Sequence, residues 1–297
     1  MIENIFKIAC IVLTLLLSSC IKEDYNTNNC PGQYTITPIS PKELNSGRSV
    51  ELKNSLTTLI DPSKDSRIVE VGSNRPLDLM KGLYTAIPVK GTDKNVEIEG
   101  KTVSVTAEST GEANNPSDFV GGYLDIDVPK TVPDWGIVNY DVPTMIQTRL
   151  LVLRVKLEGL NAQLVESLNG VINGIAISRD LDNAFLDNGT TNRFPALKSG
   201  YVNYTLGLSG TDGYYTGSRR LLGLDGVASQ ILTLNITYKG NVQKVYTFNI
   251  TNDLNGFHTK DVVQPWIIQM KLRLGADFQA NIEDWIAGPE VWIDAQH

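Results

Sequence analysis

The chain has 297 residues, of which 41% are hydrophobic and 20% are charged, so it can bury a sizeable core and is longer than one typical domain requires. Its net charge is −7 and its isoelectric point is about 5.0. Because nucleic-acid binding calls for a basic stripe, this acidic balance argues against a nucleic-acid partner. We expect two domains.

The first residues have the pattern of an export signal. Lys7 precedes the apolar stretch Ile8–Leu17, which is about 10 residues long, whereas a membrane-spanning helix needs about 20. We therefore expect residues 1–19 to be a signal peptide. The sequence Leu17-Ser18-Ser19-Cys20 resembles the bacterial lipobox, which implies that Cys20 carries two acyl chains, enough for stable anchoring. The alternative is a secretory signal that happens to contain Cys20.

A polar segment follows the lipobox. Lys22, Glu23 and Asp24 resemble the surface-export signal of lipoproteins in Bacteroidetes-type bacteria, although a plain polar tether has the same composition. Residues 20–35 are rich in Asn, so we expect a flexible tether. Cys30 is left without an intramolecular partner and is a free thiol or a link between chains. These features predict a protein held at the cell outer membrane by its lipid and exposed on the surface.

Strand patterns with a period of two begin in the first half of the chain. The candidates are Arg67–Val71, Tyr84–Val89, Val96–Ala107 and Tyr123–Val128, with turn signals that include Gly100. Pro129, Pro133 and Pro143 then interrupt any strand ladder. We therefore expect one β-sandwich over residues 36–143 and another over residues 144–297.

The second half alternates more regularly. Arg149–Leu157 and Ile267–Leu274 each place apolar residues on one face and polar residues on the other. Ile231–Tyr238 and Val242–Ile250 flank a Gly-Asn turn and predict a hairpin. Helical periodicity is confined to one short candidate, Ala162–Leu168. The predicted fold class is therefore all-β.

Several segments of the second half resemble a known family. They are Thr148-Arg149-Leu150, Glu158-Gly159-Leu160, Leu168-Asn169-Gly170-Val171, Gly174–Ile177 and Phe278–Trp285. Together with the lipobox and tether, they are similar to fimbrillin-related lipoproteins of Bacteroidetes, especially the anchor subunits of type V fimbriae. The resemblance implies two tandem transthyretin-like β-sandwich domains. It also implies that the protein anchors or caps a filament by adding a strand to, or accepting one from, a fimbrial stalk or accessory subunit.

The tail carries the candidate partner-binding residues. Glu290–Asp294 alternates and contains Trp292 and Ile293. In the assembly interpretation this segment pairs with a neighbouring subunit. In the alternative interpretation it closes its own sandwich, with Trp292 in the core.

Signals for catalysis or metal binding are weak. His258 and His297 are the two histidines, so no nucleophile–base pair or His-rich zinc site is visible, and we expect no enzyme activity and no cofactor. Asp125 and Asp127 share one face of a predicted strand, as in a solvated face. The polar run Asp180–Gly189 fails the calcium-loop spacing, so we expect no metal site.

An alternative function is that of a surface glycan-binding lipoprotein in a polysaccharide-uptake system. Sugar binding favours exposed aromatic rings, and the candidates are Tyr214, Tyr215 and Trp135. A cluster of exposed rings would favour glycan binding, whereas a long unpaired sheet edge would favour the fimbrial interpretation.

Overall fold

The computed structural model describes residues 32–39, 55–60, 67–71, 76–129, 137–181, 196–209, 213–258, 264–277 and 279–288. Nearly every element there is a strand, which confirms the all-β prediction. The elements are β1 (Gly32–Ile39), β2 (Ser55–Ile60), β3 (Arg67–Val71), β4 (Leu77–Leu79), β5 (Gly82–Lys90), β6 (Val96–Glu99), β7 (Thr102–Val105), β8 (Val120–Gly121), β9 (Leu124–Val128), β10 (Val138–Pro143), β11 (Met145–Ile146), β12 (Arg149–Glu158), the 3-10 turn Ala162–Leu164, β13 (Val165–Asp180), β14 (Lys198–Ser209), β15 (Tyr214–Leu221), β16 (Ile231–Tyr238), β17 (Val242–Asn249), β18 (Trp266–Leu274) and β19 (Ala280–Gly288). Over this part of the chain, no helix has the length and apolar character needed to cross a membrane.

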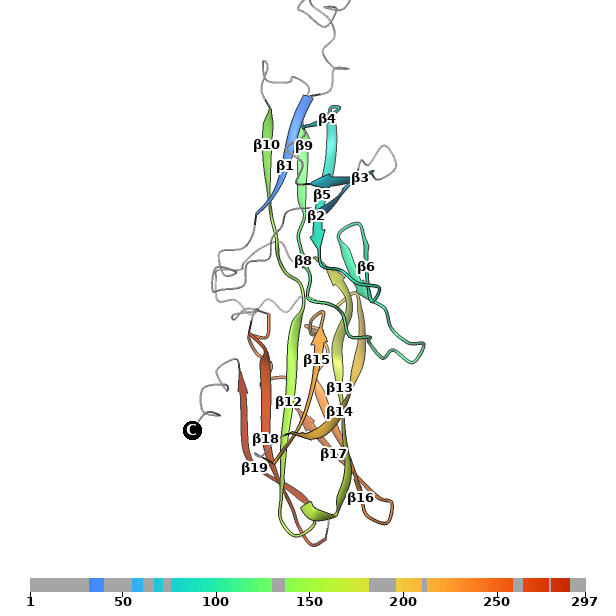
Figure 1. Cartoon of the computed structure of the whole chain (residues 1–297), viewed down its shortest axis with the longest axis vertical. Coiled ribbons are helices and arrows are strands. Elements are labelled where there is room, and N and C mark those ends of the chain that lie inside the picture. Colours follow the sequence, from blue (N-terminus) through green and yellow to red (C-terminus); the bar gives the residue numbers. More distant parts are fainter. Residues whose placement is uncertain are drawn as a thin grey trace, which may run out of the picture.

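The strands form two bodies that lie end to end along the longest axis of the molecule (Figure 1). The amino-terminal body contains a three-stranded sheet, β10-β1-β4, and a six-stranded sheet, β11-β8-β5-β2-β3, with β9 beside β5. The carboxy-terminal body contains a ten-stranded sheet, β17-β16-β13-β14-β15-β12-β18-β19, which β7 and β6 extend alongside β13.

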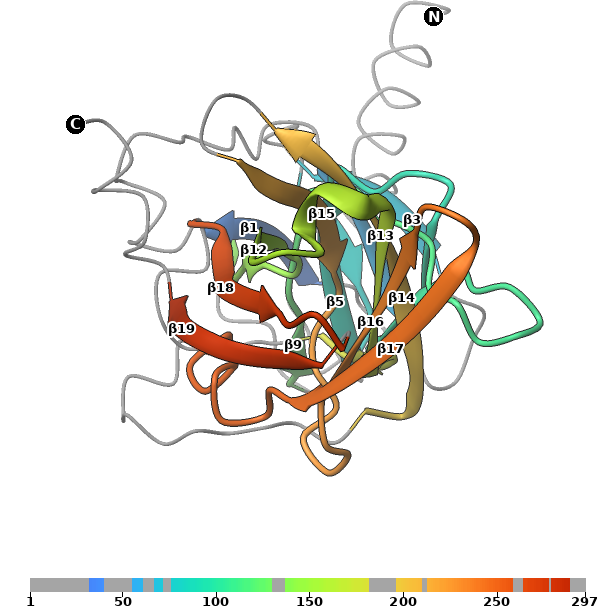
Figure 2. The same ribbon diagram turned by 90° about the horizontal axis from the view of Figure 1, so that it is seen from below.

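The ten-stranded sheet folds over on itself through β14. Residues 198–206 of this strand pair with β13, whereas residues 207–209 pair with β15. The sheet thereby makes two facing layers, which Figure 2 shows end-on. The layers pack closely, since a Cβ added to Gly170 of β13 would lie 3.2 Å from Cδ2 of Leu153 on β12. This packing creates the main core from alternate side chains of both layers.

The amino-terminal body is also a two-layer sandwich. Its core joins Tyr34 and Ile36 of β1 to Tyr84 of β5 and Ile126 of β9, which belong to the other sheet. β1 lies in the middle of the small sheet, between β10 and β4. The strand therefore holds the start of the described chain inside the fold.

Two boundaries differ from the prediction. β1 begins at Gly32, inside the segment predicted to be a flexible tether, because Tyr34 and Ile36 alternate with polar residues and are buried. The hairpin β6–β7 comes from the first half of the chain but pairs with β13, through Thr102–Ser104. The sheets therefore do not separate at residue 143, and the division into two domains stays a prediction.

Individual elements were predicted with different success. Arg67–Val71 and Ile231–Tyr238 have the observed bounds of β3 and β16. The stretch 96–107, predicted as strand with a turn signal at Gly100, forms two strands because the chain turns at Gly100, where φ is 58°. The predicted short helix is wrong beyond Leu164, since Val165 already pairs with Tyr238 in β13.

Candidate functional site: free sheet edges and a polar junction

Buried polar side chains join the two bodies where the chain passes from β11 to β12. Arg149, at the start of β12, is 3% exposed. Its Nε donates to the carbonyl of Gln264 at 2.9 Å and its Nη1 donates to that of Phe257 at 2.6 Å. The guanidinium also lies 4.9 Å from the centre of the Trp266 ring. Arg149 therefore ties the start of β12 to the turns that lead into β18.

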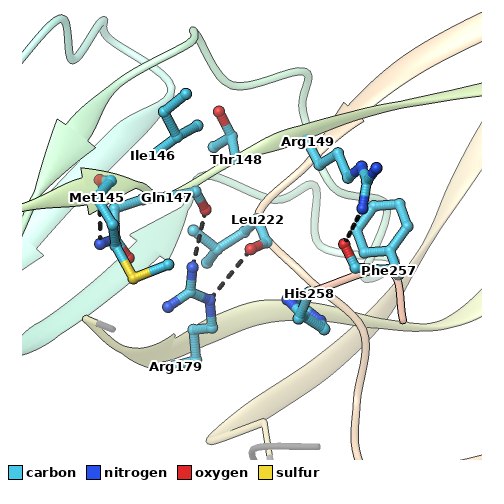
Figure 3. A pocket seen from close by; sticks show the side chains of 9 residues that line it. All are labelled: Met145, Ile146, Gln147, Thr148, Arg149, Arg179, Leu222, Phe257 and His258. Carbon is cyan, nitrogen blue, oxygen red and sulfur yellow. Dashed lines mark hydrogen bonds between the residues drawn. The ribbon is translucent and has the colours of Figure 1, made fainter. Parts of the chain in front are cut away.

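Arg179 of β13 makes the second part of this junction (Figure 3). Its Nη2 donates to the carbonyl of Gln147 at 2.8 Å, and its Nε donates to that of Leu222 at 3.1 Å. The side chain of Gln147 in turn donates from Nε2 to the carbonyl of Gly121 on β8 at 2.8 Å. Because β8 belongs to the amino-terminal body, this chain of hydrogen bonds connects the bodies directly.

His258 has a structural position in the same junction. Its Nε2 accepts the backbone N–H of Leu224 at 3.0 Å, so this nitrogen carries no proton. Its ring meets that of Phe257 edge-on at 5.3 Å. The nine residues around the junction line a partly open space of about 10 Å³, on the scale of one water molecule. The junction therefore fits a role in fixing the chain, and this space is too small for a substrate.

Besides the outer side of β6, which pairs with β7 alone, two edges of the ten-stranded sheet carry no partner strand within the described residues. They are the outer sides of β19 and β17, at opposite ends of the strand order. The rings of Phe248 on β17 and Trp285 on β19 lie 6.3 Å apart, so the two edges border the same side of the sandwich. Ile282 and Ile286 of β19 remain 46% and 44% exposed. An edge with free backbone groups and exposed apolar side chains is suited to strand addition.

The predicted partner-binding and lipid sites cannot be placed. Trp292 and Ile293 follow β19 but lie outside the described residues, as do Cys20 and the export signal Lys22, Glu23 and Asp24. Their assignments stay predictions.

The aromatic candidates for glycan binding do not share a surface in the described part of the chain. Tyr214 and Tyr215 are consecutive in β15 and point to opposite faces. The ring of Tyr214 is buried beneath Arg154, whose guanidinium lies 4.6 Å from the ring centre, and Tyr215 packs against the main core. Trp135 lies outside the described residues. These two tyrosines therefore make no joint platform.

The predicted solvated face of β9 is confirmed. Asp125 and Asp127 are exposed, whereas Ile126 is buried. Asp125 accepts hydrogen bonds from Nζ of Lys101 at 2.6 Å and from the hydroxyl of Thr85 at 2.7 Å. The hydrogen bond from Lys101, and to a smaller extent that from Thr85, lowers the pKa of Asp125. No group of three or more His, Cys, Asp or Glu among the described residues could hold a metal ion.

Sequence reasoning missed Arg179 and Gln147. A signal for the arginine was present, because Arg179 has the same parity as Ile175 and Ile177 in a strand whose alternate residues are buried. A cation on an apolar face requires buried acceptors, and the structure supplies backbone carbonyls. No comparable signal marks Gln147.

These sheets define the chain as an all-β protein built from packed β-sheets. The solved structures with this fold include the fimbrial anchor protein Mfa2 from Porphyromonas gingivalis, with a TM-score of 0.61 and 11% identity over 88% of this chain and 98% of that one. Two candidate adhesins from Bacteroides ovatus are also similar. One has a TM-score of 0.56 and 12% identity over 88% of this chain and 96% of its own. The other has a TM-score of 0.53 and 14% identity over 88% and 95%. No family model matches the sequence, and no curated protein matches it.

Proposed function

We propose that this chain is a lipid-anchored surface protein that anchors or caps a fimbrial filament through strand-addition contacts with another subunit. The observation that carries the proposal is the free edge of β19, on a fold similar along nearly its whole length to that of a fimbrial anchor protein. Backbone groups of this edge supply the hydrogen-bonding row, and Ile282 and Ile286 supply apolar contacts.

The two ends of the chain have different roles in this proposal. Cys20 carries the lipid that holds the protein in the outer membrane, and residues 22–24 direct it to the surface. Trp292 and Ile293, a few residues after β19 in the sequence, extend the contact with a fimbrial stalk or accessory subunit. The likeness to candidate adhesins supports a place in adhesion and assembly.

The membrane part of the proposal is tested by following the lipid. Cys20→Ser should abolish incorporation of a labelled fatty acid and release the protein from the membrane fraction. The control is Cys30→Ser, which should change neither. Full incorporation of label into Cys20→Ser would contradict the assignment.

The assembly part is tested by following filaments in the native strain. Deletion of the gene should shift filaments from the cells to the medium or change their length, and the wild-type gene should restore them. The double variant Ile282→Lys/Ile286→Lys should fail to restore them, because cations on an edge strand disfavour pairing with another strand. The matched control is Val227→Lys, at a residue that is 83% exposed and lies outside the strands. Filaments that are normal in the deletion strain would overturn the proposal.

A further inference from the structure

The strand nearest the predicted lipid is held in an unusual way. β1 runs parallel to β10 over six register pairs, from Tyr34–Val138 to Ile39–Pro143. On its other side, β4 pairs antiparallel with it over Gly32–Tyr34. Parallel strands adjacent in a sheet require a long crossover, and here nearly one hundred residues of chain separate the two strands.

The orientation of this pair determines how tension passes through the molecule. β1 starts at the end of the molecule that faces away from the carboxy-terminal body (Figure 1). β10 points the same way as β1 and continues through residues 144–148 into β12, which runs to the opposite end of the molecule. A pull on Gly32 therefore reaches the far end through the pairing of β1 with β10 and then along one covalent strand.

The direction of that pull decides how the pairing resists it. Tension along the strand axis acts on all six register pairs at the same time, so they must break together. Tension across the strands acts on the first pair alone, and the pairs then break one after another. The same pairing consequently withstands a much higher force when the tension acts along the strand axis.

Side chains reinforce the pairing against sliding. Tyr34 is 1% exposed, and its ring stacks on that of Tyr140 of β10 at 5.8 Å. The hydroxyl of Thr35 donates to the side-chain carbonyl of Asn139. Sliding by one residue would move Tyr34 and Ile36 from the core face to the other face of the sheet.

The junction then transfers the force to both bodies. The backbone N–H of Gln147 donates to the carbonyl of Phe119, its side chain donates to β8, and its carbonyl accepts from Arg179. Arg149 ties the start of β12 to the turns before β18 through its bonds to the carbonyls of Gln264 and Phe257. The passage between β10 and β12 is therefore held on both sides.

We propose that β1 and β10 form a shear clamp, which lets the chain carry tension between its amino-terminal end and its far end without unfolding. The inference deepens the proposed function and rests on it for its biological purpose, since a subunit between a membrane and a filament is pulled from its two ends. The clamp itself is a property of the isolated chain.

The clamp is tested by stretching single molecules of the full chain in two directions. Cys10 and Cys20 are changed to Ser, so that Cys30 provides one attachment point close to β1. In the shear variant the second point is Leu160→Cys, in the turn at the far end of β12, where Leu160 is 73% exposed. In the matched unzipping variant it is Ile137→Cys, directly before β10, where Ile137 is 52% exposed.

The shear variant should rupture at a force several-fold higher than the unzipping variant at the same pulling speed. Its first rupture should lengthen the molecule by no more than the extended chain from residue 30 to residue 138, roughly 390 Å at about 3.6 Å per residue. Adding Thr35→Val should lower the force in the shear variant, because it removes the bond to Asn139.

Equal forces in the two directions, or a first rupture that releases more chain than this, would overturn the clamp. Filaments play no part in the measurement. A failed clamp therefore leaves the assembly proposal standing, and a normal filament phenotype in the deletion strain leaves the clamp standing.

Discussion

The two bodies of this protein differ in which strands supply their described core side chains. In the carboxy-terminal body, one cluster of 25 buried residues among those described, such as Leu153 and Leu234, fills the space between two long layers. In the amino-terminal body, the corresponding cluster of described side chains has eight members, and two of them, Tyr34 and Ile36, come from β1. Among the described residues, the first core therefore comes mainly from the long strands of one folded sheet, whereas the second takes two of its members from β1, the first described strand.

A third cluster lies between them and limits their independence. It combines Ile87 of β5 and Phe119 with Val103 of β7, Leu181 and Leu222. With the hydrogen bonds of Gln147 and Arg179, it predicts that the bodies unfold together in the wild type.

Truncation of the large core should have the largest effect. Leu153→Ala removes a side chain that is 0% exposed, and we expect the free energy of unfolding to fall by about 4 kcal/mol through lost burial and the cavity left behind. Urea unfolding followed by the fluorescence of buried Trp266 measures it. Val245→Ala, at an exposed residue of β17, is the control and should change little. A loss no greater than that of the control would show that the core is less tightly packed than its geometry indicates.

Breaking the junction should separate the two bodies. Arg179→Met leaves the carbonyls of Gln147 and Leu222 without this donor, at a cost of about 3 kcal/mol. We expect calorimetry to resolve two transitions where the wild type has one. Arg179→Lys is the informative control, because it keeps the charge but loses the planar arrangement of donors. This variant should retain only part of the coupling between the two bodies. A single unchanged transition in Arg179→Met would mean that the hydrophobic cluster alone couples the bodies.

The sequence allowed some strands to be predicted far better than others. β12, β16 and β18 were predicted because over most of their length buried residues alternate with less buried ones, which leaves a period of two in the chain. β1 was missed because only two of its residues, Tyr34 and Ile36, belong to the buried core, and they stand in a polar stretch. Two alternating positions are too few to mark a strand within such a stretch.

The candidate site was predictable only in its outline. A sheet margin open to another chain was expected, and free edges are present at β17 and β19. Which strands would form them could not be deduced, because strand order depends on how β14 bends between the layers. Trp292 and Ile293 remain predictions for the neighbouring contact.

A buried tyrosine in the carboxy-terminal body gives a smaller and pH-dependent effect. The hydroxyl of Tyr204 is buried without a hydrogen-bond partner among the described residues, so Tyr204→Phe should change the free energy of unfolding at pH 7 by no more than about 0.5 kcal/mol. Burial raises the pKa of Tyr204 above its ordinary value of 10.0. Because the folded state favours the neutral phenol, the stability that this group contributes is complete below pH 10 and falls as the pH rises further.

The measurement is urea unfolding at a series of pH values from 7 to 11. Wild-type stability should decline above pH 10, and Tyr204→Phe should decline less steeply. Identical slopes for the two proteins would show that Tyr204 stays neutral or gains access to water before the chain unfolds.

The smallest expected effect concerns the exposed pair of Asp125 and Lys101, which joins β9 to the β6–β7 turn and so links the amino-terminal body to a hairpin of the other sheet. The pKa of Asp125 is lowered by the hydrogen bonds from Lys101 and Thr85, so its contribution is present above about pH 4 and is lost as the pH falls through the folded-state pKa. The two side chains are 61% and 38% exposed, and solvent therefore reduces the contribution to a few tenths of a kcal/mol. Asp125→Asn should lower stability by this amount at pH 7 and by progressively less as the pH falls through the folded-state pKa of Asp125. Lys101→Met should remove most of the difference between Asp125 and Asn. A loss above 1 kcal/mol at pH 7 would mean that this surface pair, and not only the buried junction, couples the two bodies.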